Sequence, residues 1–145
     1  DSAEPTGNSL AIMNLLRLSY ITDKTEWYDK AHVSILAFSG KLQQMPYAMP
    51  QMLVALDYLL NKPKQIVIAG KKNDETALRM IEYVHRKFMP NKILIFVEPD
   101  KISKSKTFAA KVITGSDKTT AYVCENFACR LPENTIEEFK KLLNN

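Results

Sequence analysis

Hydrophobic residues in the first sixty positions recur at helical spacing. Residues 10–20 are apolar at nearly every position, and Asn14, Arg17 and Ser19 are the polar exceptions. A helix that is apolar almost all round is normally covered on both sides, so we expect an inner helix of a helical array. The polar residues 6–9 directly before it offer several N-cap side chains.

Two further helices are predicted before residue 63. A single apolar stripe at steps of three and four indicates a helix packed on one side, formed by Tyr28, Ala31, Ile35, Phe38, Leu42 and Met45. Pro46 ends it. The next helix begins near Pro50 and is expected to bury Leu53, Leu56, Leu59 and Leu60. The order is therefore inner, outer, inner, with antiparallel neighbours joined by short loops.

After residue 62 the pattern changes to short apolar runs typical of strands. Runs at 65–69, 93–97 and 120–124 are predicted strands, and Asn73 or Asp74 caps a helix between the first two. Its expected apolar positions are Ala77, Leu78, Ile81, Val84 and Phe88. Strand, helix and strand form a βαβ unit with parallel strands. Thr135 and Glu138 form a capping box for a last helix, and residues 108–113 fit either a short helix or a strand.

The expected fold class is therefore α/β. Residues 1–62 form a helical half, packed against a small, mostly parallel sheet with flanking helices formed by residues 63–145. Apolar residues are 46% and charged residues 25% of the 145, as in ordinary soluble domains. No run approaches the ~20 apolar residues that cross a bilayer, and no signal peptide is visible. We expect a cytoplasmic protein with no membrane partner.

The net charge of +4 is too small and too dispersed to indicate a nucleic-acid partner. The loop from Gly70 to Asp74 joins a predicted strand to a helix start, where an anion can bind. Because Gly70 is its only glycine, the dinucleotide fingerprint is absent and an ordinary capped turn is the simpler interpretation. We expect no cofactor.

Cys124 and Cys129, the only cysteines, lie five positions apart after a predicted strand. This spacing fits a disulfide, half of a metal site or two packed thiols. A Cys-X-X-Cys redox motif has two intervening residues, whereas four are present here. Zinc usually needs four ligands, and His32 and His85 lie on distant predicted helices, so no metal site is expected. Both cysteines remain redox candidates, although cytosolic thiols are usually reduced.

Polar residues also precede both predicted inner helices. If alternate helices face a common axis, these segments meet at one end of it and form a site for a small ligand. Helix capping is the simpler alternative. The ligand-binding candidates are Glu4, Asn8, Ser9, Tyr47 and Gln51. Glu4 is the only carboxylate among them, whereas acid–base chemistry on sugars usually uses two, so no catalytic residue is assigned.

Several segments resemble one known family. They are Thr6-Gly7-Asn8-Ser9-Leu10-Ala11, Asn14-Leu15-Leu16-Arg17-Leu18, Ala55-Leu56-Asp57-Tyr58-Leu59-Leu60, Pro90-Asn91-Lys92 and Thr120-Ala121-Tyr122-Val123-Cys124 with Asn126-Phe127-Ala128-Cys129. The chain is similar, over nearly its whole length, to the C-terminal region of thioredoxin-domain-containing proteins related to spermatogenesis-associated protein 20.

The resemblance implies that residues 1–62 are the last helices of an α/α toroid of the six-hairpin glycosidase type. It also implies partner domains in the same polypeptide, namely a thioredoxin-like domain and the rest of the toroid, and a carbohydrate ligand. Two other hypotheses stay open: a non-catalytic interaction module, and a thiol redox switch at Cys124 and Cys129.

Overall fold

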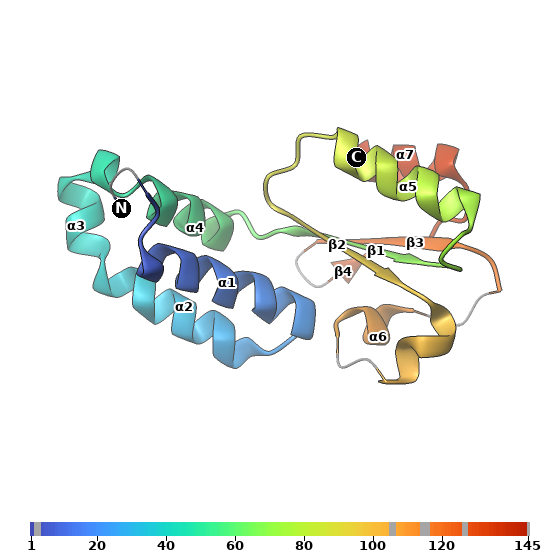
Figure 1. Ribbon diagram of the computed structural model, residues 1–145, viewed down its shortest axis with the longest axis horizontal. Helices are drawn as coiled ribbons and strands as arrows, with labels where there is room; N and C mark the ends of the chain where they lie inside the picture. Colours follow the sequence, from blue (N-terminus) through green and yellow to red (C-terminus); the bar gives the residue numbers. More distant parts are fainter. Residues whose placement is uncertain (2–3, 105–106, 114–116, 126–127, 145) are drawn as a thin grey trace. The chain divides into compact units, whose positions relative to one another are not determined.

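A computed structural model describes residues 1, 4–104, 107–113, 117–125 and 128–144. The chain divides into two compact units, Asp1–Lys62 and Pro63–Asn145. The first unit is helical and the second contains the sheet (Figure 1). The α/β class expected from the sequence is confirmed.

The helical unit contains α1 (Gly7–Thr22), α2 (Thr25–Ala37), α3 (Ser39–Gln44), the short 3-10 turn η1 (Pro46–Ala48) and α4 (Pro50–Leu60). The hydroxyl of Thr6 accepts a hydrogen bond from the Ser9 N–H and caps α1. Asp23 ends this helix in the left-handed conformation, with φ of 57°. Proline occupies the first position of α4, where its missing N–H costs nothing.

Helix α1 contacts α2 and α4. Its buried side chains lie on one face, at positions 9, 12, 13, 16, 19 and 20. Leu10 and Leu18 are exposed on the opposite side. The predicted cover on both sides is therefore absent from the described part of this chain, which supplies neighbours for one face only.

Two predicted details of the helical unit were wrong. The single helix expected through Met45 is interrupted at Phe38, and α3 begins at the following residue. In α4 the buried face consists of Met52, Ala55, Tyr58 and Leu59, while Leu60 is exposed. Leucine content predicted the face poorly, because the contacts of α4 with α1 decide which side is covered.

The sheet unit contains β1 (Lys64–Ala69), α5 (Glu75–Arg86), β2 (Lys92–Val97), the 3-10 helix η2 (Pro99–Lys104), α6 (Ala109–Val112), β3 (Thr120–Glu125), β4 (Ala128–Cys129) and α7 (Ile136–Asn144). Within the described residues the strand order is β2-β1-β3-β4. Strand β1 pairs in parallel with β2 and antiparallel with β3, which pairs antiparallel with β4. The sheet is thus mixed rather than mostly parallel, because β3 begins where β1 ends, with Thr120 opposite Ala69.

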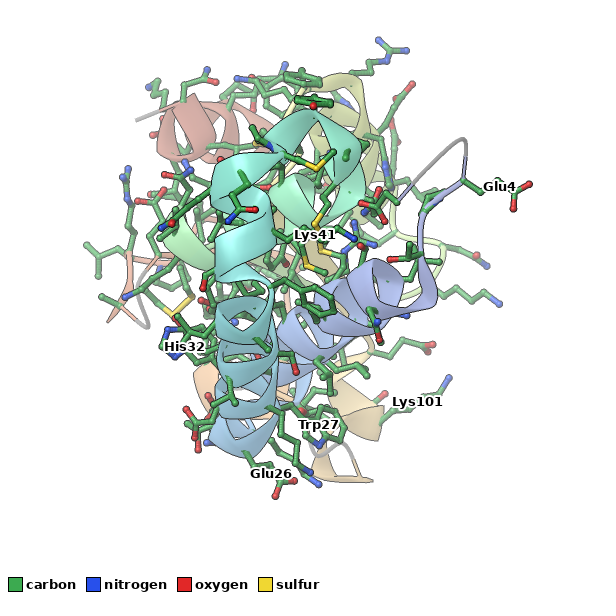
Figure 2. The ribbon with its side chains drawn as sticks, turned by 90° about the vertical axis from the view of Figure 1, so that its left-hand side faces the viewer. Glu4, Glu26, Trp27, His32, Lys41 and Lys101 are labelled. Carbon is green, nitrogen blue, oxygen red and sulfur yellow. A yellow bond between two sulfur atoms is a disulfide. The ribbon has the colours of Figure 1, made fainter. Side chains whose placement is uncertain are left out.

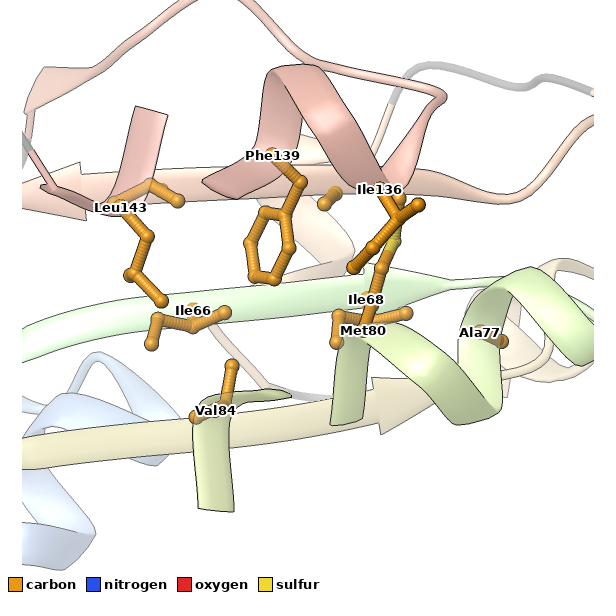
Figure 3. Close-up of a cluster of buried hydrophobic side chains, with 10 residues drawn as sticks. Ile66, Ile68, Ala77, Met80, Val84, Ile136, Phe139 and Leu143 are labelled. Atoms are coloured by element: carbon orange, nitrogen blue, oxygen red, sulfur yellow. The ribbon is translucent and has the colours of Figure 1, made fainter. Parts of the chain in front are cut away.

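Both faces of this sheet are covered. Helices α5 and α7 lie on one face, where Ile66 and Ile68 of β1 pack with Met80, Val84 and Phe139 (Figure 3). The opposite face is covered around α6, and its buried cluster is formed by Val67, Ala69, Phe108, Ala109, Tyr122 and Cys124. Strand β1 is buried on both faces, which explains its uninterrupted apolar sequence.

Candidate functional site

The carboxylate of Asp1 joins the starts of α1 and α4. Its Oδ1 accepts hydrogen bonds from the Thr6 N–H (2.8 Å) and the Ser9 hydroxyl (2.7 Å). Its Oδ2 accepts one from the Met52 N–H at 3.0 Å. A negative charge is favourable at the N-terminus of a helix, and this carboxylate serves two helices. The two helices therefore begin at the same end of the unit.

The predicted ligand-binding residues are separated by this arrangement. Ser9 is buried, and its hydroxyl is hydrogen-bonded to Asp1 and Thr6. Glu4 and Asn8 are exposed and Gln51 is half-buried, and Tyr47 is 79% exposed. Figure 2 shows Glu4 projecting away from the helices. The structure thus brings Ser9 to the start of α4 and leaves Glu4 and Tyr47 facing solvent.

Asp1 was missed by the sequence reasoning. Met49, the N-cap residue of α4, makes no side-chain capping bond. The carboxylate of Asp1, 51 positions before Met52, accepts from the Met52 N–H and takes this role. A helix start with no polar side chain at the cap was the one available signal, because it requires an acceptor from elsewhere.

The turn after β1 is an ordinary capped turn. The Asp74 carboxylate accepts from the Ala77 N–H (2.9 Å) and from the Thr119 hydroxyl (2.8 Å). The bond from the Ala77 N–H, followed by that from Thr119, lowers the pKa of Asp74. Because this carboxylate already occupies the start of α5, the anion site considered for the loop is filled by the protein itself.

A pocket of about 320 Å³ lies at this end of β1. Its lining pairs two lysines, Lys71 and Lys118, with two aspartates, Asp74 and Asp117. Gly70 lies against the lining residue Thr119, and a Cβ at this position would lie 2.5 Å from the Thr119 Oγ1, so a larger residue would displace that side chain. The balanced charges give the pocket no preference for an anion or a cation.

Cys124 and Cys129 form a disulfide that joins β3 to β4. The two residues lie directly opposite each other in the antiparallel pair. The Arg130 N–H donates to the Val123 carbonyl in the neighbouring pair, so the cysteines occupy a non-hydrogen-bonded pair, in which Cα atoms approach most closely. Their Cα atoms are 3.9 Å apart. Of the three arrangements that the spacing allowed, the structure contains the disulfide.

The two ends of this disulfide have different environments. Cys124 is 0% exposed, in the cluster beneath the sheet, whereas Cys129 is exposed. Glu125, which follows Cys124 in β3, pairs with Lys64 at 2.7 Å and lies 3.8 Å from Arg130. The hydrogen bond from Lys64 lowers the pKa of the Glu125 carboxyl. Of the two disulfide residues, Cys129 is therefore the one that faces solvent.

Within the described residues, no three His, Cys, Asp or Glu side chains are grouped as a metal site would require. The same part of the chain has no helix of the length and apolar character that crossing a membrane requires.

The sequence is similar to curated proteins that are much longer. Spermatogenesis-associated protein 20 of Homo sapiens is 37% identical over 147 residues, covering 99% of this chain and 19% of the human protein. The Rattus norvegicus protein of the same name is 35% identical over the same share. An uncharacterized Caenorhabditis elegans protein, B0495.5, is 30% identical over 99% of this chain and 20% of its own length. No protein-family profile and no solved structure matches.

This chain therefore spans about a fifth of the length of the curated relatives it matches.

Proposed function

We propose that this chain is the C-terminal part of a larger thioredoxin-domain-containing protein, in which the helical unit completes an α/α toroid. One observation carries the proposal: every long helix of the unit exposes large apolar side chains. They are Leu10 and Leu18 on α1, Val33 and Leu36 on α2, and Val54 and Leu60 on α4.

The six exposed side chains are distributed over all three long helices of the unit. Single exposed apolar residues are common, but contiguous apolar surface indicates a contact with another part of a protein. The human relative is about five times as long as this chain, which supports the proposal that the rest of the same polypeptide covers this surface. We infer that further toroid helices cover the outer side of α1.

A substitution at Leu18 tests this packing in the full-length polypeptide. If neighbouring helices bury Leu18, Leu18→Ala costs about 2–5 kcal/mol of stability. Leu78→Ala is the matched control, because Leu78 is exposed on α5 of the sheet unit and its loss costs within about 0.5 kcal/mol. Amide hydrogen exchange of α1 measures the stability change in Leu18→Ala, and that of α5 measures the change in Leu78→Ala. Equal, small effects would show that Leu18 faces solvent in the full-length polypeptide too.

The shared end of α1 and α4 is the proposed wall of a small-molecule cleft, with a carbohydrate as ligand. Its support is the convergence of both helix starts on Asp1. Asn8 and Tyr47 are exposed at or just before these starts and make the proposed contacts. Calorimetry with glucose and glucuronic acid is expected to show weaker binding for Asn8→Ala and Tyr47→Ala, and unchanged binding for Gln43→Ala on α3. Unchanged binding in all three variants would remove Asn8 and Tyr47 from the site.

The second candidate function is a thiol–disulfide switch at Cys124 and Cys129. It rests on the unequal exposure of the two cysteine residues, which join the paired strands β3 and β4 at the edge of the sheet. Exposed disulfides are the labile ones, whereas buried ones resist reduction. If the protein is cytoplasmic, as we propose, its thiols meet a reducing environment, and a disulfide there is transient rather than structural.

The reductant is a dithiol. One of its thiolates attacks the Sγ of Cys129, forming a mixed disulfide and releasing the Cys124 thiolate, which takes up a proton. The second thiolate of the reductant then attacks the reductant's own sulfur in that mixed disulfide. Cys129 leaves as a thiol, and the reductant carries away the new disulfide, so two electrons pass to the protein.

Single-cysteine variants test the direction of attack. In Cys124→Ser the remaining Cys129 is exposed and is expected to react with dithionitrobenzoate at least about tenfold faster than Cys124 in Cys129→Ser, because reactivity follows access. Dithiothreitol titration of the unsubstituted protein gives the reduction potential. Equal rates in both variants, or a disulfide that resists cellular glutathione levels, would contradict a switch.

A further inference from the structure

A groove runs between α5 and α7 on the outer side of the sheet unit. These helices contact each other and cover the same face of the sheet (Figure 1). The groove is lined by Arg79, Glu82, Tyr83, Arg86, Ile136 and Lys140. Neither the proposed toroid nor the disulfide uses this surface.

Positive charge predominates in this groove. Glu82 is its one carboxylate among the described residues, and it is paired with Arg86 at 2.6 Å. Arg79 and Lys140 have no ion-pair partner in the described part of the chain, and Lys87 contacts the same tyrosine ring as Lys140. Uncompensated cations grouped on a rigid surface repel one another, and an anionic partner removes that repulsion.

Tyr83 holds two of these cations together. The Nζ atoms of Lys87 and Lys140 lie 5.3 Å and 5.4 Å from the centre of its ring. The Tyr83 hydroxyl donates to the Asn144 side chain at 3.4 Å, and Lys87 donates to the same Asn144 oxygen. Cation–π contacts and an amide therefore fix the two ammonium groups at the C-terminal end of α5.

The arrangement excludes base stacking. The ring of Tyr83 is approached by two ammonium groups and, at 6.3 Å with an edge-on angle of 72°, by Phe139. Proteins that hold single-stranded nucleic acid offer aromatic faces on which bases stack, whereas this ring is already contacted by two ammonium groups.

The spacing of the cations favours a partner with several acidic groups. Arg79 and Arg86 are seven residues apart on α5, which places them on nearly the same side and about 10 Å apart along the axis. Carboxylates three residues apart on an extended, polyproline-like peptide lie on one side and are about 9 Å apart, which is close to the spacing of Arg79 and Arg86 along α5.

We infer that the α5–α7 groove binds an acidic peptide segment, with Arg79, Arg86, Lys87 and Lys140 contacting its carboxylates over an apolar floor at Ile136. The glutamate in the groove orients Arg86 by pairing with it. This function is independent of the toroid and of the disulfide.

A charge-reversal pair tests the inference in the full-length polypeptide. The probe is fluorescein-labelled hexaglutamate at low salt, with hexaglutamine as the neutral peptide. Arg79→Glu/Lys140→Glu is expected to weaken hexaglutamate binding by about tenfold or more, because rim charges act on their partner across the groove. Lys30→Glu/Lys41→Glu makes the same change in net charge on exposed positions of the helical unit and is expected to change affinity less than about twofold.

Each other outcome overturns the inference. Equal losses in both double variants would show that net charge alone attracts the peptide. Equal affinity for hexaglutamine would remove the role of carboxylates, and tighter binding of an oligothymidylate of matched charge would assign the surface to nucleic acid. If Arg79→Glu/Lys140→Glu loses its circular dichroism signal, Arg79→Gln/Lys140→Gln replaces it, with an expected loss of about threefold.

Discussion

The core between α7 and the sheet makes a direct prediction about Phe139. Its side chain is 0% exposed and packs among Ile66, Ile68, Met80 and Val84. Replacing it with alanine loses the transfer free energy of the ring, about 2–3 kcal/mol, and the edge contact with Tyr83, about 0.5–1.5 kcal/mol. A cavity that the rigid sheet cannot fill adds to this, and we expect a total of about 3–5 kcal/mol.

The chain supplies a matched control for this substitution. Phe88 follows α5, is 94% exposed, and was expected from the sequence to be part of the apolar face of that helix. That expectation was wrong, because α5 ends at Arg86 and Phe88 lies beyond its last turn. Phe88→Ala should therefore change stability by no more than about 0.5 kcal/mol.

The assay has to report on the sheet unit. The single tryptophan, Trp27, lies on α2 of the helical unit, so its fluorescence does not follow this core. Urea dependence of amide exchange at Ile66 and Ile68 gives the free energy of opening β1 directly. If Phe139→Ala costs less than about 1 kcal/mol, or no more than Phe88→Ala, the described packing of α7 on β1 is refuted.

Three further predictions follow from single contacts. Folding lowers the pKa of the Asp74 carboxyl. The stability that this carboxylate contributes is therefore complete above the unfolded pKa near 4 and is lost as pH falls below it. Asp74→Asn should remove that acid sensitivity in chemical denaturation curves, and Asp74→Ala should cost about 1 kcal/mol at pH 7. The buried Tyr58 hydroxyl has no hydrogen-bond partner among the described residues, so Tyr58→Phe should leave the melting temperature unchanged or raise it, whereas a loss above about 1 kcal/mol would reveal a partner elsewhere in the polypeptide. The disulfide closes a loop with a sequence separation of 5, and its reduction should lower the free energy of unfolding by about 2 kcal/mol. Reduction should also speed hydrogen exchange of the Arg130 amide, and an unchanged urea midpoint would contradict this prediction.

The local signals along the sequence predicted most of the sheet unit. Proline, capping residues and β-branched runs act within a few residues, so β1, β2, β3, α5 and α7 were located closely. The Glu138 N–H donates to the Thr135 hydroxyl at 3.3 Å, which is one of the two hydrogen bonds of the predicted capping box. Strand β4 was missed because a periodicity cannot be recognised in two residues.

Features that depend on distant contacts could not be predicted. The direction of β3 follows from where the chain re-enters the sheet, not from its apolar sequence. The spacing of the cysteines left three arrangements open, and the register of β3 with β4 decided between them. At the proposed cleft, the sequence indicated polar helix starts, and the uncapped start of α4 called for a distant acceptor without identifying it as Asp1.

The contact of Asp1 with both helices affects how the longer polypeptide should be dissected. An expression fragment that starts at residue 6 would lose the acceptor for the Met52 amide and one of the two partners of the Ser9 hydroxyl, and a buried amide left unsatisfied costs about 1–3 kcal/mol. The opening turns of α1 and α4 would fray in such a truncation. Domain boundaries for crystallisation or NMR therefore belong upstream of this aspartate.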